Sequence, residues 1–114
     1  MNEILALTNT TLLGVGTIFA LMGTITSIFP PKKINNLYGY RTASSMQSQT
    51  KWDFAQKYSS KVMTIVGIVL ILISFTKNYL PFSESQHSIF SIALMIISGI
   101  IMFITIEKRL QKVS

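Results

Sequence analysis

The sequence has no cysteine, one histidine and only four acidic residues among its 114 residues. Without cysteine there is no disulfide framework, no thiolate metal site and no cysteine nucleophile. The four acids are Glu3, Asp53, Glu84 and Glu107. They are far apart in the sequence, and His87 has only Glu84 close by, whereas a metal site usually needs three or four ligands. We therefore predict neither an enzyme nor a metal or cofactor site.

Charge is also scarce, because charged residues make up 12% of the chain and hydrophobic residues 49%. Soluble domains carry about 25% charged residues. A soluble chain of this length could not cover its apolar surface with so few charges, whereas lipid tails solvate apolar side chains directly. The composition favours a membrane protein. In that setting the net charge of +6 does not indicate nucleic acid, and we expect no nucleic-acid partner.

Three apolar stretches are each long enough to cross a hydrocarbon core of about 30 Å, which takes roughly 20 residues. The sequence therefore predicts a single all-α membrane domain with three transmembrane helices, at about residues 5–29, 62–80 and 88–106. A soluble helical bundle would need polar faces that the second and third stretches lack. The first stretch ends at Pro30 and Pro31 and has no basic start, so we expect a retained helix and not a cleaved signal peptide.

Basic residues predict the orientation, because Lys and Arg concentrate in cytoplasmic segments. The predicted loop over residues 30–61 carries six of them and the tail over residues 107–114 carries three, whereas the connection before the turn at 81–87 carries only Lys77. In a chain with three spans this loop and the tail must share a side. We expect the N-terminus outside and the C-terminus inside a bacterial cytoplasmic membrane, with anionic lipid headgroups as partners.

The second half of this long loop has the features of a helix. Ser44 and Gln47 have the spacing of a capping box. Neither glycine nor proline occurs between Ser44 and Gly67. The predicted helix either continues into the second span or lies flat at the membrane surface.

Small residues recur every four positions in the first stretch, at Gly16, Ala20 and Thr24. Small residues at this spacing let helix backbones approach closely. They predict the side on which the first helix packs. A contact within one chain is favoured over a seam between copies in a homo-oligomer.

The loop contains an ordered series of short motifs. They are Pro31-Lys32-Lys33-Ile34-Asn35, Tyr38-Gly39-Tyr40-Arg41-Thr42, Ser45-Met46 and Trp52-Asp53-Phe54-Ala55. In this order they resemble the loop signature of the SdpI family of bacterial membrane proteins. The chain departs from that signature at Gln47-Ser48, at Thr50 and at Gln56, where the family tends to have Asn. The family's namesake has a further N-terminal membrane region, so we expect a stand-alone SdpI module.

The resemblance implies two functions. The family's namesake protects a producing bacterium from its own secreted toxin peptide, and it is also described as capturing a cytoplasmic repressor at the membrane. The implied partner is therefore a toxin peptide or, in the alternative, a cytoplasmic regulator. A lipid-acting enzyme or transporter is a third alternative, which the lack of an acid–base pair disfavours.

The residues that we expect to bind a partner or a lipid headgroup all lie in the motifs. They are Asn35, Tyr38, Gly39, Tyr40, Arg41, Thr42, Ser45 and Trp52. Arg41 ranks first because a guanidinium can hold a carboxylate or phosphate through two hydrogen bonds. Its alternative role is to pin the loop to a helix-end carbonyl or to lipid headgroups. We expect Gly39 to permit a turn, Asn35 to close one through its side chain, and Trp52 to anchor the loop in the membrane interface.

Overall fold

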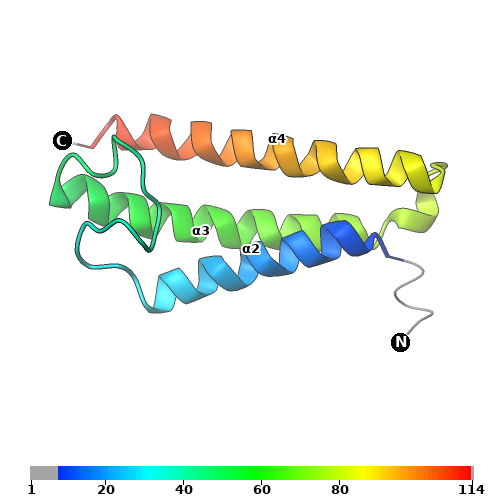
Figure 1. The fold of residues 1–114 in the computed structure, drawn as a ribbon, viewed down its shortest axis with the longest axis horizontal. Helices are drawn as coiled ribbons and strands as arrows, with labels where there is room; N and C mark the ends of the chain where they lie inside the picture. The colour runs from blue at the N-terminus through cyan, green and yellow to red at the C-terminus, as the bar shows by residue number, and fades with distance from the viewer. Residues whose placement is uncertain (1–7, 114) are drawn as a thin grey trace.

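The computed structural model describes residues 8–113, and within that range it contains helices and no strands (Figure 1). The helices are α2 (Thr10–Ile28), α3 (Gln49–Ser74), the short 3₁₀ helix η1 (Lys77–Tyr79) and α4 (Glu84–Leu110). The helices α2, α3 and α4 are each long and apolar enough to cross a membrane. The predicted all-α protein with three spanning helices is thus confirmed.

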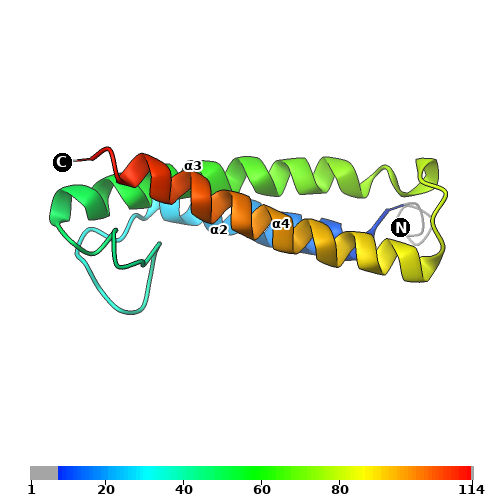
Figure 2. The same ribbon diagram turned by 90° about the horizontal axis from the view of Figure 1, so that it is seen from above.

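The three long helices run side by side along the 48 Å axis of the molecule (Figures 1 and 2). The loop after α2 and the end of α4 lie at one end, at the left of Figure 1, and α2 begins at the other. The first is termed the basic end, because the loop and tail carry nine of the ten Lys and Arg residues. The second is termed the opposite end. The loop and tail therefore share a side, as the orientation argument requires.

Helix α3 extends from the loop into the second span as one continuous helix of 26 residues, so the loop helix does not lie flat. Its N-cap is Ser48, whose hydroxyl accepts a hydrogen bond from the amide of Lys51 at 3.1 Å. The capping box predicted at Ser44 is therefore wrong. The reason is a competing local turn, in which the Ser45 hydroxyl accepts from the amide of Thr42 at 2.8 Å.

The other two long helices have clear starts. The side chain of Asn9 caps α2 by accepting from the amide of Leu12, and the predicted start at about residue 5 lies outside the described residues. Helix α4 begins with a capping box, in which Ser83 and Gln86 exchange hydrogen bonds between side chain and backbone. Helix α4 ends at Leu110, so it is longer at both ends than the predicted third span over residues 88–106.

Helices α2 and α3 pack closely because small residues face each other. A Cβ added to Gly67 would lie 2.6 Å from the carbonyl oxygen of Gly16, and one added to Gly23 would lie 2.7 Å from the amide of Thr64. The predicted seam is confirmed at Gly16 and Ala20 as a contact within one chain. Thr24 is exposed, and Gly23 takes its place because a helical face follows the spacing i, i+4, i+7.

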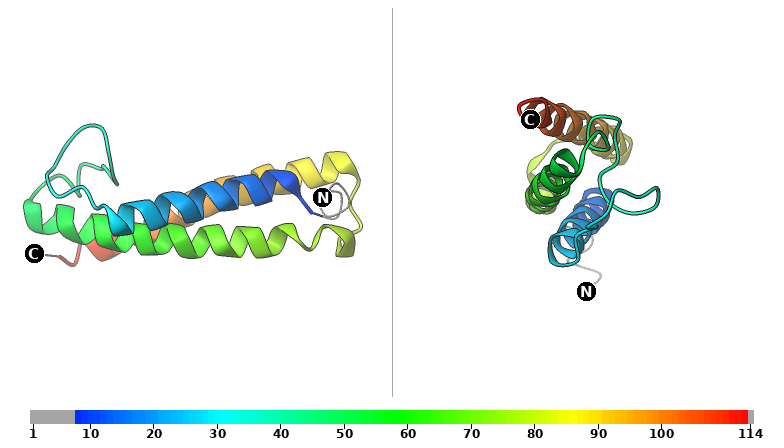
Figure 3. Two further views of the ribbon diagram at one scale, coloured as in Figure 1. Left: turned by 90° about the horizontal axis from the view of Figure 1, so that it is seen from below. Right: turned by 90° about the vertical axis from the view of Figure 1, so that its left-hand side faces the viewer.

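Helix α4 packs on the other two mainly at its ends. Its buried residues are His87 and Ser91 near the opposite end and Ile106 and Leu110 near the basic end. The middle of α4, between Ser91 and Ile106, has no buried residue. The end-on view in Figure 3 shows the three helices as the corners of a triangle.

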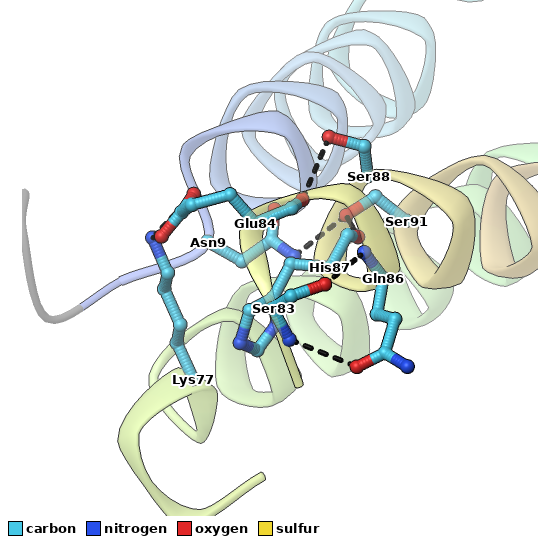
Figure 4. Close-up of polar contacts among 8 residues, drawn as sticks. All are labelled: Asn9, Lys77, Ser83, Glu84, Gln86, His87, Ser88 and Ser91. Carbon is cyan, nitrogen blue, oxygen red and sulfur yellow. Dashed lines mark hydrogen bonds and ion pairs between the residues drawn. The ribbon is translucent and has the colours of Figure 1, made fainter. Parts of the chain in front are cut away.

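The opposite end is fastened by polar contacts (Figure 4). Asn9 donates from Nδ2 to the hydroxyl of Ser91 at 2.6 Å, and its backbone amide donates to the carbonyl of Ser74 at 2.8 Å. This one residue therefore joins α2 to both α4 and α3. Lys77 and Glu84 form an ion pair at 3.3 Å beside it. Within residues 8–113 no three His, Asp or Glu side chains gather as a metal ion would require.

The glycine contact predicts a large effect of Gly67→Leu. The new side chain would displace the backbone of α2, and overpacking of this kind costs about 1–3 kcal/mol. We expect the free energy of unfolding in detergent micelles, measured by circular dichroism, to fall by that amount. The matched control is Gly14→Leu, because a Cβ at Gly14 would meet nothing within 4 Å, and its change should stay within about 0.5 kcal/mol. Equal stability of the two variants would contradict the proposed packing.

Candidate functional site

The loop at the basic end is held to α3 through the backbone of Tyr40. The side-chain amide of Gln56 donates from Nε2 to the Tyr40 carbonyl at 2.7 Å and accepts from the Tyr40 amide at 2.7 Å. Gln56 is buried, so the amide group and the backbone satisfy each other where water has little access. This two-way contact fixes the position of Tyr40 on α3.

The side chain of Tyr40 continues from there to α4. Its hydroxyl donates to Oε2 of Glu107 at 2.8 Å, and the hydroxyl of Thr42 donates to the same oxygen at 3.1 Å. Burial raises the pKa of Tyr40 well above its ordinary value, and the hydrogen bond to Glu107 and its negative charge raise this pKa further. The loop thus connects the basic ends of α3 and α4.

Two tight turns shape the loop before Tyr40. Asn35 accepts from the amides of Leu37 and Tyr38 at 2.9 and 2.7 Å and donates to the carbonyl of Lys33, so the turn predicted at Asn35 is confirmed. Gly39 has a φ of 103°, a conformation that glycine adopts at no steric cost. A Cβ there would also lie 2.6 Å from Cγ of Pro31. The predicted turn at Gly39 is confirmed, and the space around it requires glycine as well.

Two aromatic side chains hold the start of the loop by hydrogen bonds to its backbone carbonyls. Trp52 is fully buried and donates from Nε1 to the carbonyl of Pro31 at 2.7 Å. The prediction that Trp52 anchors the loop in the membrane interface is therefore wrong, because its ring and its N–H are both used inside the protein. The hydroxyl of Tyr38 donates to the carbonyl of Phe29 at 2.8 Å, next to the end of α2.

Of the eight residues predicted to form a site, Arg41 is the one that is exposed. Its Nη1 donates to the carbonyl of Asn36, which is in the loop and not at a helix end. Ser45 is fully buried and bonds to the backbone of Thr42. The structure therefore brings the signature residues that precede α3 together as a single hydrogen-bonded unit, residues 30–48, which is termed the cap, and Trp52 on α3 forms a hydrogen bond to it. Most of their polar groups hold the cap together, and Arg41 extends from it.

A cavity of about 330 Å³ lies beneath the cap, between the three helices. Tyr38, Gly39, Tyr40 and Arg41 line it at the cap, and methionines from all three helices line it farther in. The thioether side chain of methionine adapts to ligands of irregular shape. The site as a whole is thus an apolar cavity with one cationic side chain at its mouth.

Gln56 and Glu107 were missed as site residues in the sequence. Gln56 was noted only as a departure from the SdpI signature, although its amide forms the clamp on Tyr40. Glu107 is the single acid after residue 84, placed directly after the last apolar stretch. That isolation is the signal that could have pointed to it.

Three spanning helices with a capped basic end define a small multi-pass membrane protein. Residues 32–106 match the model of the SdpI/YfhL protein family, and the chain belongs to this family. It is similar to the protein named "Uncharacterized protein YfhL" from Bacillus subtilis (strain 168), with 35% identity over 96 residues, or 84% of this chain and 82% of that protein. No solved structure matches the chain.

The contact between Tyr40 and Glu107 predicts an unusual tyrosine titration. The absorbance of tyrosinate in the wild type minus that in Tyr40→Phe should rise well above pH 10, near which a free tyrosine ionises. In the unfolded chain Tyr40 loses its proton at the ordinary pKa, so its stabilising contribution is complete below that pH and is lost as the pH rises through the raised pKa of the folded state. Glu107→Gln should move the step toward lower pH. A step at the ordinary pKa in the wild type would show that Tyr40 is not buried against Glu107.

Proposed function

We propose that this chain is an SdpI-like immunity protein of the bacterial cytoplasmic membrane, which protects a cell against a membrane-active toxin peptide. Membership of the SdpI/YfhL family supports the proposal. In this proposal the cap is a structural element, because most of its signature residues bond to one another and to α3 and α4. The peptide binds along the membrane-spanning part of the protein.

The observation that carries the proposal is the exposed outer face of α4, whose other side is half-buried along its middle part. Ile92 and Ile96 in this middle part are 54% and 58% exposed, and Ile89, 68% exposed, continues the same face toward the opposite end at the spacing i, i+3 and i+7. Within residues 8–113 no other segment buries this face, since the fully buried residues of α4 lie near its two ends. An apolar helix that enters the membrane can lie along this face and meet isoleucine side chains at helical spacing.

The chemistry of the face suits such a partner. Helices associate in lipid mainly by van der Waals packing, because lipid tails are as apolar as the side chains. Isoleucine is branched at Cβ and stiff at χ1, so it loses little freedom when a partner covers it. With the predicted orientation, Ile89 to Ile96 lie in the outer half of the bilayer, which a secreted peptide reaches first.

A challenge assay tests the proposal. The chain is expressed in a bacterium that is sensitive to the toxin peptide against which the family's namesake protects, and the inhibitory concentration is measured. We expect the wild type to raise this concentration and the double variant Ile92→Ala/Ile96→Ala to lower protection about tenfold, which corresponds to about 1.4 kcal/mol of lost contact.

The matched control is Ile65→Ala/Ile68→Ala on α3, which truncates two isoleucines of similar exposure, 52% and 48%. This control should protect as well as the wild type. Membrane levels of all variants are compared by immunoblot. Killing that the wild-type chain leaves unchanged, at normal membrane levels, would overturn the proposed immunity function. Equal loss in both double variants would overturn the site on α4.

A further inference from the structure

The cavity beneath the cap is apolar through most of its depth. Met22, Met63 and Met102 line it from α2, α3 and α4. Along α4 it extends from Ile106 to Gly99, a distance of about 10 Å at 1.5 Å per residue. Its inner part therefore lies within the apolar span of the helices, and its other end lies at the cap.

The cavity opens sideways between α2 and α4. Met22 on α2 and Phe103 on α4 both line the cavity, yet they are 42% and 53% exposed. The cap lies across the same side, as the right-hand view in Figure 3 shows. In a membrane this opening faces the hydrocarbon of the bilayer. Its edge at the basic end is formed by the cap.

The mouth of the cavity has hydrogen-bond donors to spare. Arg41 lines it and is exposed, and within residues 8–113 its guanidinium makes one hydrogen bond, to the carbonyl of Asn36. A guanidinium carries five N–H donors in a planar array that fits a phosphate. The nearby carboxylate of Glu107 already accepts from the hydroxyls of Tyr40 and Thr42. The basic end as a whole also carries nine Lys and Arg against two acids, Asp53 and Glu107.

From this arrangement we infer that the cavity is a binding site for one anionic phospholipid. One acyl chain fills the apolar part among the methionines, and the phosphate lies at the guanidinium of Arg41. The volume of about 330 Å³ falls within the range of about 300–1,000 Å³ typical of ligand sites. An empty cavity would forfeit van der Waals contacts along its whole lining, and at this depth hydrocarbon is the medium that surrounds the opening. The inference does not depend on the proposed immunity function.

Native mass spectrometry tests the inference, with the protein purified in a mild detergent and offered equal amounts of phosphatidylglycerol and phosphatidylcholine. We expect the wild type to retain one lipid and to prefer phosphatidylglycerol about fivefold, the effect of one cationic side chain at an anionic lipid. Arg41→Gln should remove this preference. Since Arg41 is exposed and its hydrogen bond is to the loop backbone alone, this variant should keep the fold.

A second variant fills the cavity. A Cβ added to Gly99 would meet nothing within 4 Å, so Gly99→Leu can place its side chain in the space that the acyl chain would occupy. It should lose the retained lipid. Gly14→Leu is the matched control, because Gly14 is equally open and does not line the cavity. Equal retention by Gly99→Leu and Gly14→Leu would overturn the acyl-chain site, and equal retention of the two lipids by the wild type would overturn the anionic class of ligand.

Discussion

The clamp between Gln56 and the backbone of Tyr40 is the interaction on which the basic end depends. It fixes one residue of an irregular loop to a helix by two hydrogen bonds of 2.7 Å, and the Tyr40 hydroxyl then reaches Glu107 on α4. Buried backbone groups need partners, and a loop without a sheet or helix must find them in side chains. The motifs of the family are therefore understood first as the parts of a rigid cap.

The arrangement of the three long helices depends on how closely each pair packs. Glycines bring α2 and α3 together, with Gly67 against Gly16, whereas the fully buried residues of α4 lie near its two ends and its middle part is at most half-buried. At the opposite end, Asn9 holds all three helices through hydrogen bonds. The middle of α4 is thus available to other membrane components. Because α4 packs less closely than α2 and α3 do, a cavity remains between the three helices, and the cap covers it at the basic end.

Parts of this architecture were predictable because they depend on nearby residues. The spans follow from the length of the apolar stretches, and the turns at Asn35 and Gly39 follow from local turn chemistry. The partners of Tyr40 were not predictable, since they lie 16 and 67 residues away in the chain. Trp52 was misjudged because an aromatic residue in a loop gives the same pattern whether it faces the membrane interface or the interior. The N-terminus of α3 was misplaced because Ser44 and Ser48 are both suitable N-cap residues, and the sequence alone does not distinguish them.

The central claim, that the loop is a fixed cap, is tested most directly by hydrogen exchange of its backbone amides. The amides of Tyr38, Tyr40, Thr42 and Ser45 each donate to a side chain. Exchange in such groups requires local opening, so we predict protection of at least about tenfold at all four in the wild type. In Gln56→Leu the protection at Tyr40 should be lost. Exchange of the wild-type loop at the rate of an unprotected chain would contradict the account.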